Sequence, residues 1–134
     1  ALQLLKTKAA EEYQMVTKYI GVIECVTSGS GMQAWNNPPR FQIGKLSMGN
    51  PVWEAGAIVH DSFHSKLYHD YLDNNPDITT VPDEIWTGEV AETRCLDVQV
   101  QALQKLGAEQ WLIDGAKKTL ETKWWLTPHE KTWW

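Results

Sequence analysis

The sequence has few cysteines, no long apolar run and no excess of basic residues. Its two cysteines, Cys25 and Cys95, are too few for a disulfide framework in a chain of 134 residues. We expect both to be free, buried thiols, with a disulfide between them left open. No apolar stretch approaches the length that spans a bilayer, which argues against a membrane span. The formal net charge is −5, and because phosphate binding needs a basic face, nucleic acid is excluded as the main partner.

The beginning of the sequence, Ala1-Leu2-Gln3-Leu4-Leu5-Lys6, lacks the features of a secretory signal. Because the first residue is not Met, processing or trimming could have removed such a segment, so the compartment stays open. The length predicts one domain over residues 1–134, large enough to bury a core without disulfides. We find no internal repeat and no low-complexity segment, and nothing indicates the oligomeric state.

The first half of the chain predicts a helix followed by a small sheet. Apolar residues recur at helical spacing over residues 3–17, and β-branched residues favour a strand over residues 19–27. Segments 32–35 and 41–43 are each expected to pair back, because the turn-forming run 36–39 separates them. Together they predict a small antiparallel sheet.

The second half predicts three helices, which makes the fold class α+β. Asn50 is a good cap for a helix that begins at Pro51 and runs to about residue 72. A second helix opens at Pro82 and continues to residue 106, where Gly107 is a suitable C-terminal cap. The last helix is expected over residues 109–122.

Tryptophan is unusually frequent, with eight residues. Such rings can stack on sugars or dock a partner. We interpret Trp53, Trp86 and Trp111, which sit at helical spacing, as residues that cover the core. The final pair, Trp133 and Trp134, carries no prediction.

Two histidines lie one helical turn apart in the run Ile58-Val59-His60-Asp61-Ser62-Phe63-His64. At about 100° per residue, His60 and His64 fall on the same side of the predicted helix as most of its aromatic residues, whereas His69 points away. Such a pair also arises by chance, and a buried histidine is often only a hydrogen-bonded core residue. The pair alone therefore leaves metal binding open.

Glu92 stands in the middle of the apolar face of the next helix, with Gln99 on the same face and Cys95 and Leu103 among the apolar residues there. A carboxylate buried without a partner costs several kcal/mol, so something must compensate it. A histidine or a basic residue would do so without metal. A divalent cation held by two neutral imidazoles and this carboxylate also does so, and matches a catalytic zinc site that keeps a fourth position for water. We predict a Zn²⁺ site of His60, His64 and Glu92.

The run His60-Asp61-Ser62-Phe63-His64 resembles the His-Glu-x-x-His zinc motif of the zincin metallopeptidases. A glutamate ligand on the following helix is similar to the gluzincin arrangement in that group. The resemblance covers roughly residues 1–107 and implies a minimal zincin fold. It implies a metallopeptidase acting on a peptide or protein substrate, with His60, His64 and Glu92 as zinc ligands and Asp61 as general base. By the same analogy, segment 32–35 would be an edge strand for an extended peptide.

Asp61 departs from the family pattern, which has Glu at this position. The Asp carboxylate reaches about 1.5 Å less far, and a misplacement of about 1 Å can cost on the order of a hundredfold in rate. The site therefore uses a shifted helix, or is slow or specialised, or binds metal without hydrolysing peptides. Tyr68 is a candidate oxyanion donor or a half-buried core residue. Glu89 is a candidate to orient a ligand imidazole, or a first-turn acid if a new helix starts at Thr87.

Two other functions stay open. A non-catalytic module would use the buried polar trio for a structural metal or a closed hydrogen-bond network, and would recognise a partner through its tryptophans. The dipeptide His60-Asp61 also resembles the centre of HD-type phosphohydrolases. That family needs a further metal-binding histidine upstream, and no histidine precedes His60.

Overall fold

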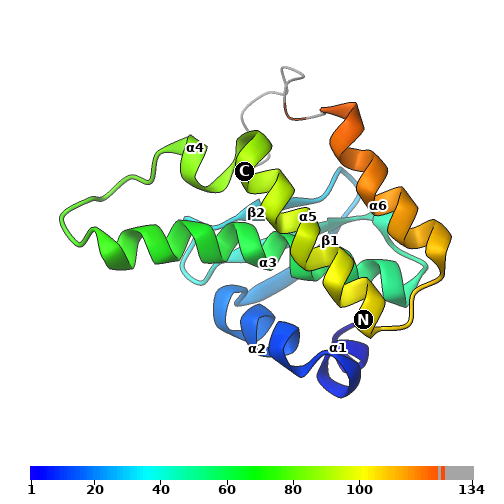
Figure 1. Ribbon diagram of the computed structural model, residues 1–134. Coiled ribbons are helices and arrows are strands. Elements are labelled where there is room, and N and C mark those ends of the chain that lie inside the picture. The colour runs from blue at the N-terminus through cyan, green and yellow to red at the C-terminus, as the bar shows by residue number, and fades with distance from the viewer. Residues whose placement is uncertain (124, 126–134) are drawn as a thin grey trace.

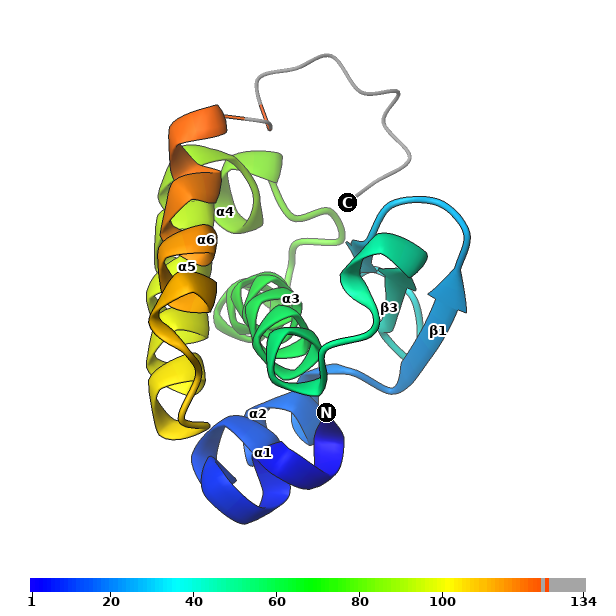
Figure 2. The same ribbon diagram turned by 90° about the vertical axis from the view of Figure 1, so that its right-hand side faces the viewer.

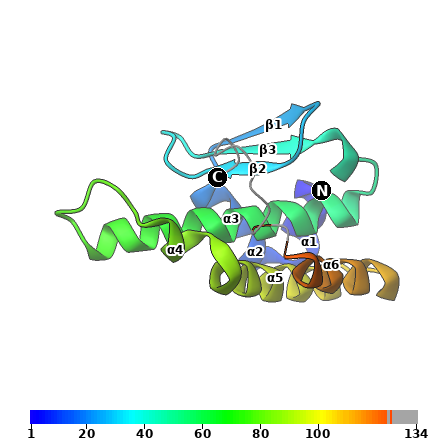
Figure 3. The same cartoon turned by 90° about the horizontal axis from the view of Figure 1, so that it is seen from above.

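A long helix runs through the centre of the molecule and is covered on several sides. The computed structural model describes residues 1–123 and 125, with the backbone alone at residue 46. The central helix α3 (Pro51–Asn74) lies between a small sheet and the helices α5 (Gly88–Lys105) and α6 (Gln110–Thr122), as Figures 2 and 3 show. The short helices α1 (Leu2–Lys8) and α2 (Ala10–Tyr19) close a third side (Figure 1). The α+β class is thus confirmed.

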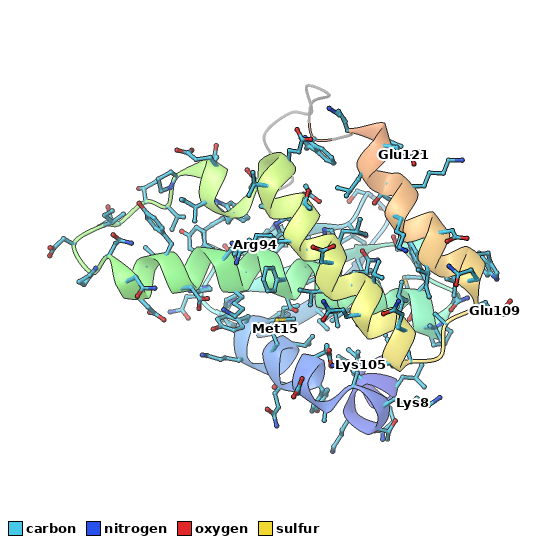
Figure 4. The ribbon with its side chains drawn as sticks, in the orientation of Figure 1. Lys8, Met15, Arg94, Lys105, Glu109 and Glu121 are labelled. Atoms are coloured by element: carbon cyan, nitrogen blue, oxygen red, sulfur yellow. The ribbon has the colours of Figure 1, made fainter. Side chains whose placement is uncertain are left out.

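The N-terminal helix is broken where the sequence predicted it to be continuous. Ala9 has an extended φ of −143° and separates α1 from α2. The predicted apolar face is nevertheless buried, because Leu5, Ala9 and Val16 all lie in the core. An ion pair between Lys105 and Glu12 also links α2 to the end of α5. Figure 4 shows Lys105 at that end of α5, beside the N-terminal helices.

The sheet is mixed, so the predicted antiparallel sheet is wrong for one of its two pairings. Its strands are β1 (Val22–Val26), β2 (Gly31–Gln33) and β3 (Arg40–Gly44), in the order β1-β3-β2. The β2–β3 pair is antiparallel, with Met32 opposite Phe41. The β1–β3 pair is parallel, with Ile23 opposite Phe41.

The parallel pairing follows from where β3 enters the sheet. The loop between β1 and β2 spans two strand spacings, roughly 10 Å, which a few residues can bridge. β3 then fills the gap between them. Because β1 and β2 run in opposite directions, a strand that is antiparallel to β2 is parallel to β1. Gly44 lets the loop pass closely, since a Cβ there would lie 2.4 Å from the carbonyl oxygen of Ser28. The hydroxyl of Ser30 fixes the same contact by accepting from the Gly44 N–H at 2.9 Å.

Helix α3 begins where predicted and is buried more completely than predicted. After the short 3₁₀ turn η1 (Lys45–Ser47), the Asn50 side chain accepts hydrogen bonds from the Val52 and Trp53 N–H groups. On a helical wheel Ser62 and Ser65 lie away from the face that carries His60 and His64, yet both are fully buried. Ser65 donates to the Tyr19 carbonyl of α2, and such small side chains let the neighbouring layers approach closely.

The helix predicted from residue 82 to 106 is two helices. The single turn α4 (Asp83–Trp86) is followed by Thr87, which is extended, and α5 starts at Gly88 with a φ of +80°. The left-handed conformation of Gly88 is one that glycine adopts without strain. At the far end, Gly107 has a φ of +72° and ends α5 as the sequence predicted.

The remaining expectations about the core are met in part. Trp86 is buried and Trp53 half-buried, but Trp111 is 60 % exposed and does not cover the core. Both cysteines are free, yet only Cys95 is buried, because Cys25 faces outward on the edge strand β1. No helix in the described part of the chain has the length and apolarity needed to cross a membrane.

Candidate metal centre

Three predicted ligands come together where α3 crosses α5. His60 and His64 are one turn apart on α3, and Glu92 projects from the first half of α5. The Nε2 atom of His60 lies 3.2 Å from Glu92 Oε2, and the Nε2 atom of His64 lies 3.2 Å from Glu92 Oε1. The two Nε2 atoms are also 3.2 Å apart. The side chains of His64 and Glu92 are almost fully buried, whereas that of His60 is 16 % exposed.

The far nitrogen of each imidazole faces an oxygen acceptor. His60 Nδ1 is 3.0 Å from the amide oxygen of Gln99, and His64 Nδ1 is 2.6 Å from the backbone carbonyl oxygen of Trp86. Because these oxygens can only accept, each Nδ1 carries the proton and donates it. In the neutral ring this leaves the lone pair on Nε2, directed at Glu92. The Trp86 carbonyl is available because α4 ends there rather than continuing into α5.

The Nε2 and carboxylate atoms form a cluster of electron-pair donors that needs a cation. Without a metal or an added proton, lone pairs would face one another at 3.2 Å. Donor atoms bound tetrahedrally to zinc at about 2.0–2.1 Å are separated from each other by about 3.3 Å. The observed spacing of His60, His64 and Glu92 therefore fits a zinc-sized ion without large movements.

Cys95 joins the two histidines from the next turn of α5. Its Sγ and one ring nitrogen from each of His60 and His64 all lie within 4.8 Å of one another. Cys95 is fully buried, and the His64 ring is near enough to act on its thiol. His60, His64 and Cys95 thus form a group able to hold a metal ion, with Glu92 against both imidazoles.

The charges of the cluster are strongly coupled in the metal-free protein. Burial acts to raise the pKa of Glu92, but the interactions with the His60 and His64 rings outweigh it and lower the pKa to about 2. Burial acts to lower the pKa of His64, yet interactions with Cys95 and Glu92 raise it well above its usual range. Burial raises the pKa of the Cys95 thiol. A proton on His64 thus stabilises the cluster when no metal is bound.

Asp61 lies beside the cluster rather than in it. It is half-buried on α3, and within the described part of the chain its carboxylate has no hydrogen bond or ion pair. Burial raises its pKa, while His60 and His64 are near enough to act in the opposite direction. The carboxylate oxygens of Asp61 are therefore available to accept a proton or a hydrogen bond next to the histidines.

The two other predicted site residues lie further out. Tyr68 is half-buried one turn beyond His64, and its ring packs edge-on against Trp86 at 5.3 Å. Glu89 is in the first turn of α5, with its side chain 65 % exposed and 4.0 Å from Lys123. The structure thus places Glu89 at the surface, while Gln99 and the Trp86 carbonyl hold the imidazoles.

Sequence reasoning assigned no role to Gln99, Cys95 or the Trp86 carbonyl. Gln99 and Cys95 carried a usable signal, because they lie seven and three residues after Glu92 and therefore share its face of α5. The Trp86 carbonyl depends on a helix end that the sequence offered only as an alternative, a new helix starting at Thr87. His69, expected to point away, is half-buried and stacks at 6.4 Å on Tyr19.

A scan against protein-family models and searches of curated proteins and of solved structures found no match to this chain.

Proposed function

We propose that this protein is a zinc-dependent hydrolase that cleaves peptide bonds. The observation that carries the proposal is the orientation of the two imidazoles. Gln99 and the Trp86 carbonyl hold His60 and His64 so that each Nε2 lone pair faces the Glu92 carboxylate. Imidazoles that ligate metals almost always donate their other N–H to such an oxygen, which fixes the tautomer and raises ligand basicity.

In the proposed site, His60, His64 and Glu92 hold the ion. Zinc bound in this way lowers the pKa of its water to about 7 and polarises a carbonyl group. His60 is the more exposed ligand, so the substrate would approach from its side of the cluster.

Asp61 is the proposed general base. Its carboxylate can accept a hydrogen bond next to the two histidines, as a general base requires, and burial raises its pKa. Tyr68 would donate a hydrogen bond to the developing oxyanion. The edge strand β2, which packs beside α3, would pair with an extended substrate backbone.

The metal content of purified protein tests the site. We expect about one zinc per chain in the wild type and a large loss in His64→Ala, because one of three ligands is removed. His69→Ala is the matched control, since it removes another histidine of α3 outside the cluster. Metal retained undiminished by His64→Ala would contradict the proposal.

Hydrolysis tests the chemistry separately from binding. We expect zinc-loaded wild type to cleave unfolded protein substrates, with products identified by mass spectrometry. Asp61→Asn should keep its zinc and lose the cleavage, because the amide cannot accept the proton. Cleavage that is unaffected by Asp61→Asn would remove Asp61 from the mechanism.

A non-catalytic module with a structural metal is the second candidate. The fully buried Cys95 favours it, because structural zinc sites are closed by four protein ligands and commonly contain cysteine. Removal of the metal by a chelator separates the two functions. If the ion is structural, its removal should unfold the protein, which circular dichroism measures. If it is catalytic, its removal should abolish activity and leave most of the fold intact.

A further inference from the structure

Cys95 is the donor in the cluster that the proposed hydrolase does not use. It follows Glu92 by three residues, so the two side chains leave the same face of α5. His60 and His64, four residues apart, do the same on α3. The two helices thus each contribute a pair of donors to one point in the interior.

The packing of the two helices fixes this point. At Gly56, one turn before His60, α3 lies so close to α5 that a Cβ would be 2.9 Å from Leu103 and 3.4 Å from Gln99. Leu103 lies two turns after Cys95 and is fully buried. Because the two helices pack this closely, the Cys95 sulfur on α5 lies within 4.8 Å of ring nitrogens on α3.

The sulfur is near the distance that coordination requires. Sγ and the ring nitrogens are within 4.8 Å of one another. A sulfur at about 2.3 Å and a nitrogen at about 2.05 Å from a tetrahedral zinc are about 3.5 Å apart. A rotation of the Cys95 side chain and a shift of about 1.3 Å close the difference between 4.8 Å and this spacing.

We propose that Cys95 is a fourth protein ligand of the metal, completing a His60, His64, Glu92 and Cys95 site between α3 and α5. The proposal rests on the metal site of the preceding section. When the sulfur–metal bond forms, the thiol proton passes to the solvent, and Sγ binds as thiolate.

A thiolate ligand determines both the metal and the resting state of the site. Thiolate and imidazole select zinc-like ions over Mg²⁺ and Ca²⁺, which prefer oxygen ligands. Four protein donors also make a closed tetrahedral site, whereas a catalytic zinc site has three. The protein with Cys95 bound is therefore a resting form, and hydrolysis requires the thiolate to leave the metal.

Cobalt substitution tests this directly, because Co²⁺ bound to thiolate gives an intense sulfur-to-metal charge-transfer band in the near ultraviolet. We expect the wild type, loaded with one equivalent of Co²⁺, to show this band and the visible bands of tetrahedral cobalt. Cys95→Ser should lose the charge-transfer band and still bind cobalt through the remaining donors. Cys25→Ser, which alters the exposed cysteine of β1, should keep it and is the matched control.

The two levels of the proposal fail in different ways. Bound cobalt without a thiolate band in the wild type would overturn the role of Cys95 and leave the three-ligand site intact. Failure of the wild type to bind cobalt or zinc would overturn the metal site itself. Circular dichroism of each variant checks that it folds, and Cys95→Ala replaces Cys95→Ser if the hydroxyl is not tolerated in the core.

Discussion

Gln99 offers the sharpest test of how the site is built. In Gln99→Leu a side chain of similar size takes the place of the amide, and the His60 Nδ1–H loses the acceptor that lies 3.0 Å away. The ring is then free to rotate or to change tautomer, so its Nε2 lone pair is no longer fixed toward Glu92. Loss of such an outer partner typically lowers metal affinity by about 10- to 100-fold. This corresponds to about 1.4–2.7 kcal/mol of binding free energy, at about 1.4 kcal/mol for each factor of ten.

The assay is a zinc titration against a chromophoric chelator of known affinity, on three variants. Gln99→Leu should weaken binding by the amount given. Gln99→Glu, which supplies a carboxylate acceptor to the same ring nitrogen, should keep or strengthen it. Gln101→Leu changes an exposed glutamine of α5 and should have no effect.

An unchanged affinity in Gln99→Leu would refute the reasoning, because the orientation of His60 would then not depend on the hydrogen bond. Equal weakening in Gln101→Leu would also refute it, since the effect would then come from α5 in general. The free energy of unfolding of each metal-free variant separates an altered site from an altered fold.

Three further predictions concern packing, pH and the thiol. Gly56→Ala should destabilise the protein by roughly 1–2 kcal/mol, because the contact of the new methyl group with Leu103 outweighs the gain in helix propensity. Gly115→Ala, whose methyl group would meet nothing within 4 Å, should stabilise the protein by about 0.5–1 kcal/mol. Urea unfolding measures both changes. Because the pKa of Glu92 falls from 4.5 to about 2 on folding, the metal-free protein should lose stability as the pH drops from 4.5 to 2, and the Glu92→Gln variant should lose much less. Cys95→Ala, with three protein ligands left, should hydrolyse peptides faster than the wild type in a steady-state assay, and a slower rate would contradict a closed resting site.

Local rules of sequence predicted the elements that carry the ligands. Asn50 and Pro51 mark the start of α3, and Gly107 marks the end of α5. Helical periodicity alone placed Glu92 on the buried face of α5. These features depend on residues within one or two turns of each other, which is why a single sequence is enough to find them.

Features that depend on distant segments were not predictable in the same way. The parallel β1–β3 pairing depends on which strand fills the gap between two others. The burial of Ser62 and Ser65 depends on α2 and the sheet lying against the outer face of α3. An amphipathic wheel assumes one buried face, and the central helix of a layered fold has more than one.

The break at Thr87 connects the fold to the site most directly. In a continuous helix the Trp86 carbonyl would accept an N–H from its own helix four residues later. Because α4 ends at Trp86 and Gly88 turns the chain, that oxygen instead accepts from His64. The end of α4, which the predicted continuous helix lacked, thus fixes the orientation of the His64 imidazole.

The donor cluster must be neutralised by a cation, and protons compete with metal for that role. In the metal-free protein a proton on His64, whose pKa lies well above its usual range, keeps the Nε2 atoms and the Glu92 carboxylate from opposing one another. A metal ion has to displace that proton, and the Cys95 proton as well if the thiolate binds. Apparent affinity for zinc should therefore rise steeply with pH, by more than tenfold per unit if both protons leave. With Cys95→Ala only the His64 proton remains to be displaced, so the slope itself reports how many donors the metal takes.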